Sequence, residues 1–174
     1  VERAIPAWLL DTVHIAPIEP TQLRIPATAR MVAVEAIPGQ IVTRAIEVEP
    51  TVRDGEVKAD PDRDLLKLVV VERHRATGQV GVGLVRGFGL KRGAIGSSIA
   101  HDAHNIVVVG VDEADILRTI ETIAAMRGGL AAVVAGEVRA QLALPVAGIL
   151  SPEPLEVVAA QYEAVEQVAR ELGS

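Results

Sequence analysis

With 174 residues the chain is long enough for one domain with its own core, and the absence of cysteine excludes disulfides and thiolate metal sites. Hydrophobic residues make up 49% and charged residues 23%, which excludes a disordered tail. The net charge is −6, and the sequence holds one Phe, one Tyr and one Trp. We therefore expect no nucleic-acid partner, because a basic stripe and stacking aromatics are both missing, and short apolar runs predict no membrane span.

Prolines mark the first part of the chain, which we predict to be an extended arm over residues 1–29, followed by a domain over residues 30–174. Each proline removes a backbone donor and disfavours helix in the residue before it. The arm prolines are Pro6, Pro17, Pro20 and Pro26. The bulky cluster at Trp8, Leu9 and Leu10 is expected to anchor the arm in this core or on a neighbouring domain. Since the first residue is Val1 and not Met, we expect a fragment.

Turn residues separate the β-rich runs that follow. Residues 31–37 and 41–48 flank Pro38-Gly39, so they predict a hairpin, and Asp54-Gly55 marks a second turn. After an acidic loop at residues 60–64, short β-rich segments predict the main sheet; they are residues 66–72, 81–86, 94–100 and 105–110. The apolar run at residues 107–109 lacks alternation, which predicts a central strand covered on both faces.

An amphipathic helix is predicted over residues 112–127, with Asp112 as its cap and Gly128-Gly129 as its left-handed exit. Its buried stripe comprises Ile116, Ile120, Ile123 and Ala124. The residues placed off this stripe, and therefore in solvent, are Asp115, Arg118, Glu121 and Arg127.

A second hairpin, residues 130–134 with 138–142 around Gly136, leads to the last helix. We expect Ser151 to cap that helix, Pro152 to open it and Gly173 to end it. Its predicted docking face is Leu155, Val158, Tyr162, Val165, Ala169 and Leu172. Together these elements predict an α+β fold in which mixed β-sheets pack against two amphipathic helices in two layers.

The strongest candidate for chemistry is the stretch from Ala100 to Asn105, where His101, Asp102, His104 and Asn105 lie at the junction of two strands. A carboxylate beside a histidine can fix its tautomer, and an amide can donate to and accept from a heterocycle. The alternative is that Asp102 and Asn105 make turn hydrogen bonds and the histidines are spacers. We expect no metal here, because the two histidines would leave a strand on opposite faces and no third ligand is evident.

Three further segments are weaker candidates. The glycine-rich run at residues 87–93 could cradle a phosphate, but its spacing fits no nucleotide motif, so a tight connection is the preferred interpretation. Residues 72–75 are typical of a charged strand edge. We reject Ser97 and Ser98 as nucleophiles because no G-x-S-x-G turn surrounds them, and we expect small residues there to allow close backbone approach.

Several blocks, in order along nearly the whole chain, together resemble the C-terminal domain of bacterial and archaeal adenine deaminases. They are Pro6 to Thr12, Ile37 to Ile41, Asp60-Pro61, Asp64 to Lys67, Val71 to His74, Thr77-Gly78, Gly87 to Ile95, Ala100 to Ile106, Gly128-Gly129 and Leu144 to Gly148. The family usually has Ser where this chain has Ala103, so a hydroxyl contact at that position is either lost or not needed.

The resemblance implies membership of the amidohydrolase superfamily, a cytoplasmic role in purine salvage, and hydrolysis of adenine to hypoxanthine and ammonia by a metal-activated water. It places a divalent metal, manganese or iron, in an N-terminal barrel that is not in this chain. Since no His-x-His pair occurs here, no cofactor is expected in this chain, and the chain alone is expected to be inactive.

Two hypotheses follow about the role of the domain, with a third less favoured. In the first, His101, Asp102, His104 and Asn105 reach the barrel and shape the adenine pocket. In the second, the domain buttresses its own barrel and mediates self-association, so that exposed apolar residues mark the missing contact. The third is an independent module that binds a small molecule.

Overall fold

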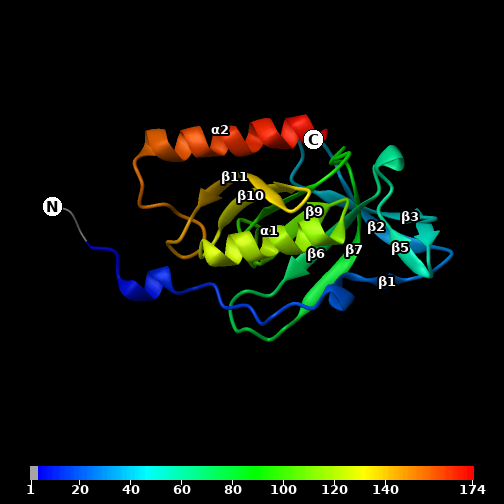
Figure 1. The fold of residues 1–174 in the computed structure, drawn as a ribbon, viewed down its shortest axis with the longest axis horizontal. Coiled ribbons are helices and arrows are strands. Elements are labelled where there is room, and N and C mark those ends of the chain that lie inside the picture. Colours follow the sequence, from blue (N-terminus) through cyan, green and yellow to red (C-terminus); the bar gives the residue numbers. More distant parts are fainter. Residues whose placement is uncertain (1–3) are drawn as a thin grey trace.

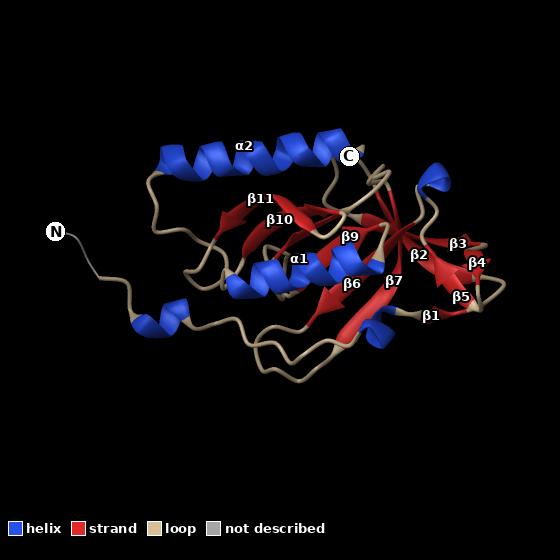
Figure 2. Cartoon of the chain, viewed as in Figure 1, coloured by secondary structure: helices blue, strands red, loops and turns tan. Residues whose placement is uncertain are grey.

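The computed structural model describes residues 4–174, and Val1 to Arg3 of the predicted arm lie outside the described residues. The helical elements are η1 (Ala7–Leu10), η2 (Pro20–Leu23), η3 (Pro61–Arg63), α1 (Glu113–Ala125) and α2 (Leu155–Leu172). The strands are β1 (Ile25–Pro26), β2 (Met31–Ala36), β3 (Thr43–Val48), β4 (Thr51–Arg53), β5 (Glu56–Lys58), β6 (Leu66–Val71), β7 (Val80–Arg86), β8 (Ala94–Ser97), β9 (Ile106–Gly110), β10 (Gly129–Val134) and β11 (Glu137–Ala143). This is the α+β fold that the sequence predicts (Figure 2).

The main sheet has the order β11-β10-β8-β9-β6-β7-β2-β3. It is mixed, because β2 runs parallel to β7 while all other neighbouring strands of the sheet are antiparallel. A small sheet has the order β1-β5-β4. Both predicted hairpins and the Asp54-Gly55 turn are confirmed. Strand β9 lies between β6 and β8, which confirms the central position expected from its apolar run.

The two helices cover opposite faces of this sheet. Ala131 of β10 belongs to the core beneath α1, whereas its neighbour Leu130 packs with Val158 and Val165 of α2. Adjacent strand residues point to opposite faces, so one end of the sheet has a helix on each side and the expected two layers become three there. Figure 1 shows α2 on one side of the strands and α1 on the other.

Helix α1 begins as predicted, because the Asp112 carboxylate accepts hydrogen bonds from the amides of Ala114 and Asp115. The placement of Asp115 in solvent is wrong: its side chain is buried and accepts from the amides of Ala135 and Gly136 in the β10–β11 turn. The helical period placed this carboxylate off the apolar stripe, and a turn distant in sequence supplies the hydrogen bonds that let it be buried.

Helix α2 begins later than predicted and docks over a shorter length. Pro154, not Ser151, is its cap, and the Ser151 hydroxyl instead accepts from the amide of Glu153. Of the predicted docking face, Val165 and Leu172 are buried, while Leu155 is 77% exposed. The periodicity identified the apolar stripe correctly but could not show how much of the stripe meets a partner.

The N-terminal segment contacts the domain through both backbone and side chains. Leu23 is fully buried in the core beneath α1, and Ile25 pairs with Val57 of β5. Trp8 is 70% exposed, so its indole is not anchored in this core, whereas Leu9 and Leu10 are half-buried.

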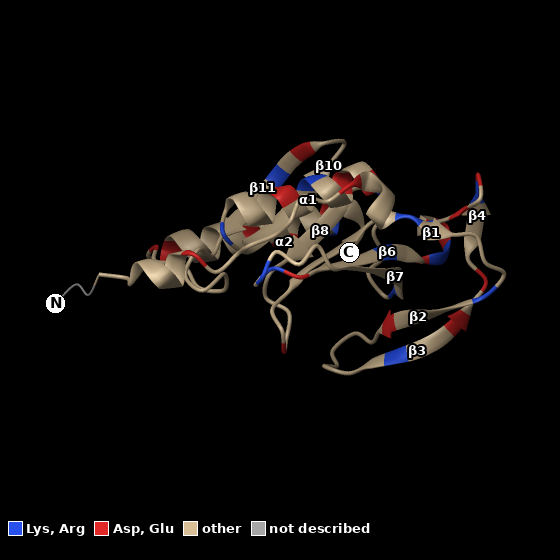
Figure 3. Ribbon diagram, turned by 90° about the horizontal axis from the view of Figure 1, so that it is seen from below, with Lys and Arg blue, Asp and Glu red and all other residues tan. Residues whose placement is uncertain are grey.

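Acidic and basic residues are interspersed along the elements (Figure 3). Among the described helices, none combines the length and the apolar character needed to cross a bilayer.

Candidate functional site

The loop between β8 and β9, residues 100–105, brings the predicted histidines together. The His104 amide donates to the Ala100 carbonyl at 2.6 Å, and the Ala100 amide in turn donates to His104 Nδ1 at 3.3 Å. The His101 and His104 rings meet edge to face with centroids 4.8 Å apart. His101 and Asp102 are exposed, whereas His104 and Asn105 are half-buried, so the loop presents part of its polar set outward.

The expectation that His101 and His104 point to opposite faces is wrong. It assumed a strand, but the segment is a turn in which His104 has a φ of 51°, and this backbone folds the second ring back towards the first. Among residues 4–174, His, Asp and Glu side chains form no group of three or more that could hold a metal ion. The donor set of this loop therefore does not fit a metal centre.

The turn alternative for Asp102 and Asn105 also fails in detail. The Asp102 carboxylate makes no hydrogen bond or ion pair within the described chain, and the Asn105 Oδ1 atom is buried without a partner there. Leaving a buried acceptor unpaired costs about 1–3 kcal/mol. The carboxylate of Asp102 and the Oδ1 atom of Asn105 therefore make no hydrogen bond within the turn.

Arg73 holds this loop in place, a role that the sequence interpretation missed. Residues 72–75 were expected to be a charged edge, yet Arg73 is 2% exposed and its Nε atom donates to the His104 carbonyl. The neighbouring His74 Nε2 atom lies 2.8 Å from the Ala103 carbonyl oxygen. The only signal in the sequence was an arginine two residues after an apolar strand, and that pattern usually marks a solvated edge.

Glu72 orders the turn that carries these two residues. Its carboxylate accepts from the amides of His74, Arg75 and Thr77, and from the Thr77 hydroxyl at 3.0 Å. Burial alone would raise the pKa of Glu72, but these donors lower that pKa from its ordinary 4.5 to about 2. The charged form is the one that the turn stabilises.

Replacing Glu72 by Gln should therefore remove a pH-dependent part of the stability. A lowered folded-state pKa contributes stability above the ordinary value of 4.5, and this contribution is lost as the pH falls through about 2. We expect the Tm of Glu72→Gln to lie below that of the parent chain near pH 6, with the gap closing towards pH 2. A gap that stays constant in calorimetry across this range would contradict the prediction.

The remaining candidates are structural. The amides of Gly87 and Gly89 both donate to the Asp64 carboxylate at 2.7 Å, so they are not free for a phosphate. Ser98 is fully buried and its hydroxyl bridges the Gly148 carbonyl, at 2.6 Å, and the Gly129 amide. These contacts agree with the interpretation that the segments allow close backbone approach.

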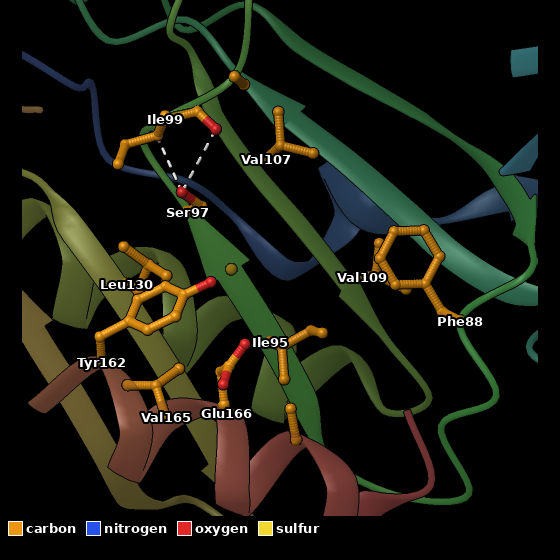
Figure 4. Close-up of a pocket in the computed structure, with 13 residues that line it drawn as sticks. Phe88, Ile95, Ser97, Ile99, Val107, Val109, Leu130, Tyr162, Val165 and Glu166 are labelled. Carbon is orange, nitrogen blue, oxygen red and sulfur yellow. Dashed lines mark hydrogen bonds between the residues drawn. The ribbon is translucent and has the colours of Figure 1, made fainter. Parts of the chain in front are cut away.

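Beside the loop, an open apolar cavity of about 320 Å³ lies between α2 and the sheet. Figure 4 shows Tyr162, Val165 and Glu166 of α2 facing Ile95 and Ser97 of β8 across it. A second cavity of about 510 Å³ adjoins it and reaches Ile149 and Leu155. We call the two together the α2 groove; they share Ser97, Ile99, Leu130 and Tyr162.

The geometry defines a class of protein: an α+β domain that holds a histidine loop beside an open apolar groove. Residues 40–174 match the family described as the adenine deaminase C-terminal domain, and the chain belongs to that family.

Individual relatives agree with the family match. Over 173 residues the chain is 46% identical to an adenine deaminase of Dehalococcoides mccartyi, covering 99% of the chain and 30% of that relative. It is 52% identical over 159 residues to one of Methanothrix thermoacetophila, covering 91% and 28%, respectively. One from Bacillus pumilus is 37% identical over 176 residues, covering 99% and 31%. The chain thus spans about 30% of the length of the relatives it matches.

Proposed function

We propose that this chain serves as the C-terminal domain of an adenine deaminase that converts adenine and water to hypoxanthine and ammonia in cytoplasmic purine salvage. The family match supports this proposal. The metal, manganese or iron, belongs to a barrel elsewhere in the enzyme and would supply the activated water. The described residues hold no cluster of His, Asp and Glu that could bind that metal, so the proposal gives this chain no metal ligand.

Within that enzyme, the loop of residues 100–105 shapes the adenine pocket from the side of this domain. The observation that carries this assignment is the paired, partly exposed imidazoles of His101 and His104 on a backbone that Arg73 and His74 fix. Imidazole nitrogens can donate to or accept from a purine edge, and the free Asp102 carboxylate adds an acceptor beside them. A fixed backbone lowers the entropic cost of presenting these groups.

Kinetics of the intact enzyme test the assignment. We expect His101→Ala and His104→Ala each to lower kcat/KM by roughly tenfold or more, because binding and orientation contacts are lost. Metal content and Tm should stay those of the parent. The control is Glu121→Ala, which removes an exposed side chain of α1. Unchanged kinetics in both loop variants would end the assignment.

A second function, buttressing of the barrel, is favoured by the α2 groove. Leu155, Tyr162 and Ile99 are 77%, 46% and 42% exposed around an apolar cavity, which is the pattern of a surface that another element covers. The Leu9 carbonyl accepts from the Ala147 amide, so the N-terminal segment is held close to Ile149 at one end of the groove. The proposed partner is a barrel joined to this domain through that segment. The covalent link would keep the barrel at a high effective concentration near the groove. We also propose that the intact enzyme is a homo-oligomer.

Charge introduced into the groove should weaken this contact. In the intact enzyme, Leu155→Glu combined with Tyr162→Glu is expected to lower the Tm of the transition in which this domain unfolds, by roughly 2–4 °C per kcal/mol lost for a domain of this size. The control is Val157→Glu, since Val157 is 40% exposed on the same helix but lies outside the groove. Sedimentation velocity would show whether the oligomer changes as well. A Tm equal to that of the control would argue against the groove as the barrel contact.

A further inference from the structure

Arg73 joins three separate segments of the chain. Besides the His104 carbonyl, its guanidinium donates from Nη1 to the Thr12 carbonyl at 3.1 Å and from Nη2 to the Ala147 carbonyl at 3.2 Å. These acceptors belong to the N-terminal arm, the histidine loop and the segment after β11. All three are neutral, and no carboxylate among residues 4–174 forms an ion pair with Arg73. The guanidinium therefore links three backbone segments by hydrogen bonds and forms no ion pair with them.

Because Arg73 is buried, its guanidinium must keep all of these hydrogen bonds. Desolvation lowers the pKa of Arg73 below its ordinary value, because burial disfavours the guanidinium ion. A buried charge is tolerated only while its hydrogen bonds are kept. The planar fork reaches three carbonyls at once, and a lysine ammonium, as a point donor, cannot reproduce that geometry. The arm, the loop and the third segment must therefore hold their positions together.

The surroundings of Arg73 strengthen this connection. The His14 amide donates to the Arg73 carbonyl at 2.7 Å, so the arm is held from the backbone side as well. A Cβ at Gly148 would overlap the guanidinium, which leaves the Arg73 side chain no room to move that way. The buried side-chain oxygens without a partner in the described chain, Thr12 Oγ1 and Asn105 Oδ1, lie on or next to residues whose carbonyls Arg73 binds.

We propose that Arg73 is a positioning residue that fixes His101 and His104 through the loop backbone and ties their position to arm residues 9–14. The link to activity rests on the proposed function of the loop, whereas the mechanical coupling does not. The Arg73 guanidinium, which binds both segments, transmits a shift of the arm to the histidines.

Hydrogen exchange of the intact enzyme tests the coupling without reference to activity. In Arg73→Lys and Arg73→Met, amide exchange should rise together in residues 9–14 and 100–105, by roughly tenfold, because loss of shared hydrogen bonds permits local opening. Exchange in α1 should stay unchanged. The control is Arg75→Met, which removes an exposed arginine from the same turn. If Arg73→Met does not fold, Arg73→Lys carries the same test.

Kinetics separate positioning from general stability. Arg73→Lys should lower kcat/KM by roughly tenfold in the parent background, since small misplacements of binding groups are costly. In a His101→Ala/His104→Ala background it should lower kcat/KM no further, because the groups that it positions are gone. An equal loss in both backgrounds would mean a merely structural role and would overturn the positioning proposal. Unchanged exchange in the loop would overturn the coupling, whereas parental kinetics of the histidine variants alone would overturn only the proposed function.

Discussion

Gly129→Ala is expected to lower the free energy of unfolding by about 3–5 kcal/mol, because strained backbone and overpacking add together. Gly129 has a φ of 138° at the start of β10, where it pairs with Ala143 of β11. A Cβ there would overlap the carbonyl oxygen of Leu142, which is backbone inside the sheet and cannot rotate away. Either the sheet would have to open at this edge, or the backbone at position 129 would have to leave its conformation.

A matched substitution in the same hairpin provides the control. Gly136 also has a positive φ, 79°, but an added Cβ would meet no atom within 4 Å. We expect Gly136→Ala to cost about 1 kcal/mol, the conformational part alone. Denaturant titration of both variants separates the two contributions. If the two variants are equally stable, the close approach to Leu142 is not the reason for glycine at position 129.

Glu113→Gln is expected to have the second large effect. It should lower the free energy of unfolding by about 3 kcal/mol, because it removes the charged partner of a buried cation. Lys67 is 1% exposed, and its ammonium donates to the Glu113 carboxylate and to the Leu23 carbonyl at 2.7 Å. Burial opposes ionisation of Glu113, but the hydrogen bonds and charges of Lys67 and Lys58 hold its pKa below the ordinary value. The Gln variant would leave the Lys67 ammonium in the core without a countercharge.

The converse change, Lys67→Met, should cost less, about 1 kcal/mol, since Glu113 keeps Lys58 at 3.2 Å and is partly open to water. Glu121→Gln on the exposed face of α1 should be near neutral, because its pair with Arg118 is half-exposed. Chemical denaturation at pH 7 ranks the three variants. A Glu113→Gln chain as stable as Glu121→Gln would contradict the buried-charge explanation.

Local patterns in the sequence determined most of the secondary structure. Turn dipeptides such as Pro38-Gly39 placed the hairpins, and Asp112 with its apolar stripe placed α1, because helix caps, turns and side-chain period depend on neighbours within a few residues. The predictions that were wrong concern residues whose conformation or burial depends on partners distant in the sequence. Ser151 has the chemistry of a cap, yet the backbone places Pro154 at that position. The division into an arm of residues 1–29 and a domain of residues 30–174 stays a prediction.

For the candidate site, the sequence by itself identified the residues, and only the tertiary structure decided how they are held. His101, Asp102, His104 and Asn105 were recognisable as a polar cluster in four of five consecutive positions. That Arg73 binds the carbonyls of Thr12, His104 and Ala147 could not be predicted, since those partners are 61, 31 and 74 residues away. The same holds for the buried Asp115 and Lys67. Whether a charged side chain is buried depends on which hydrogen-bonding groups the fold brings to it, and this information lies in long-range packing.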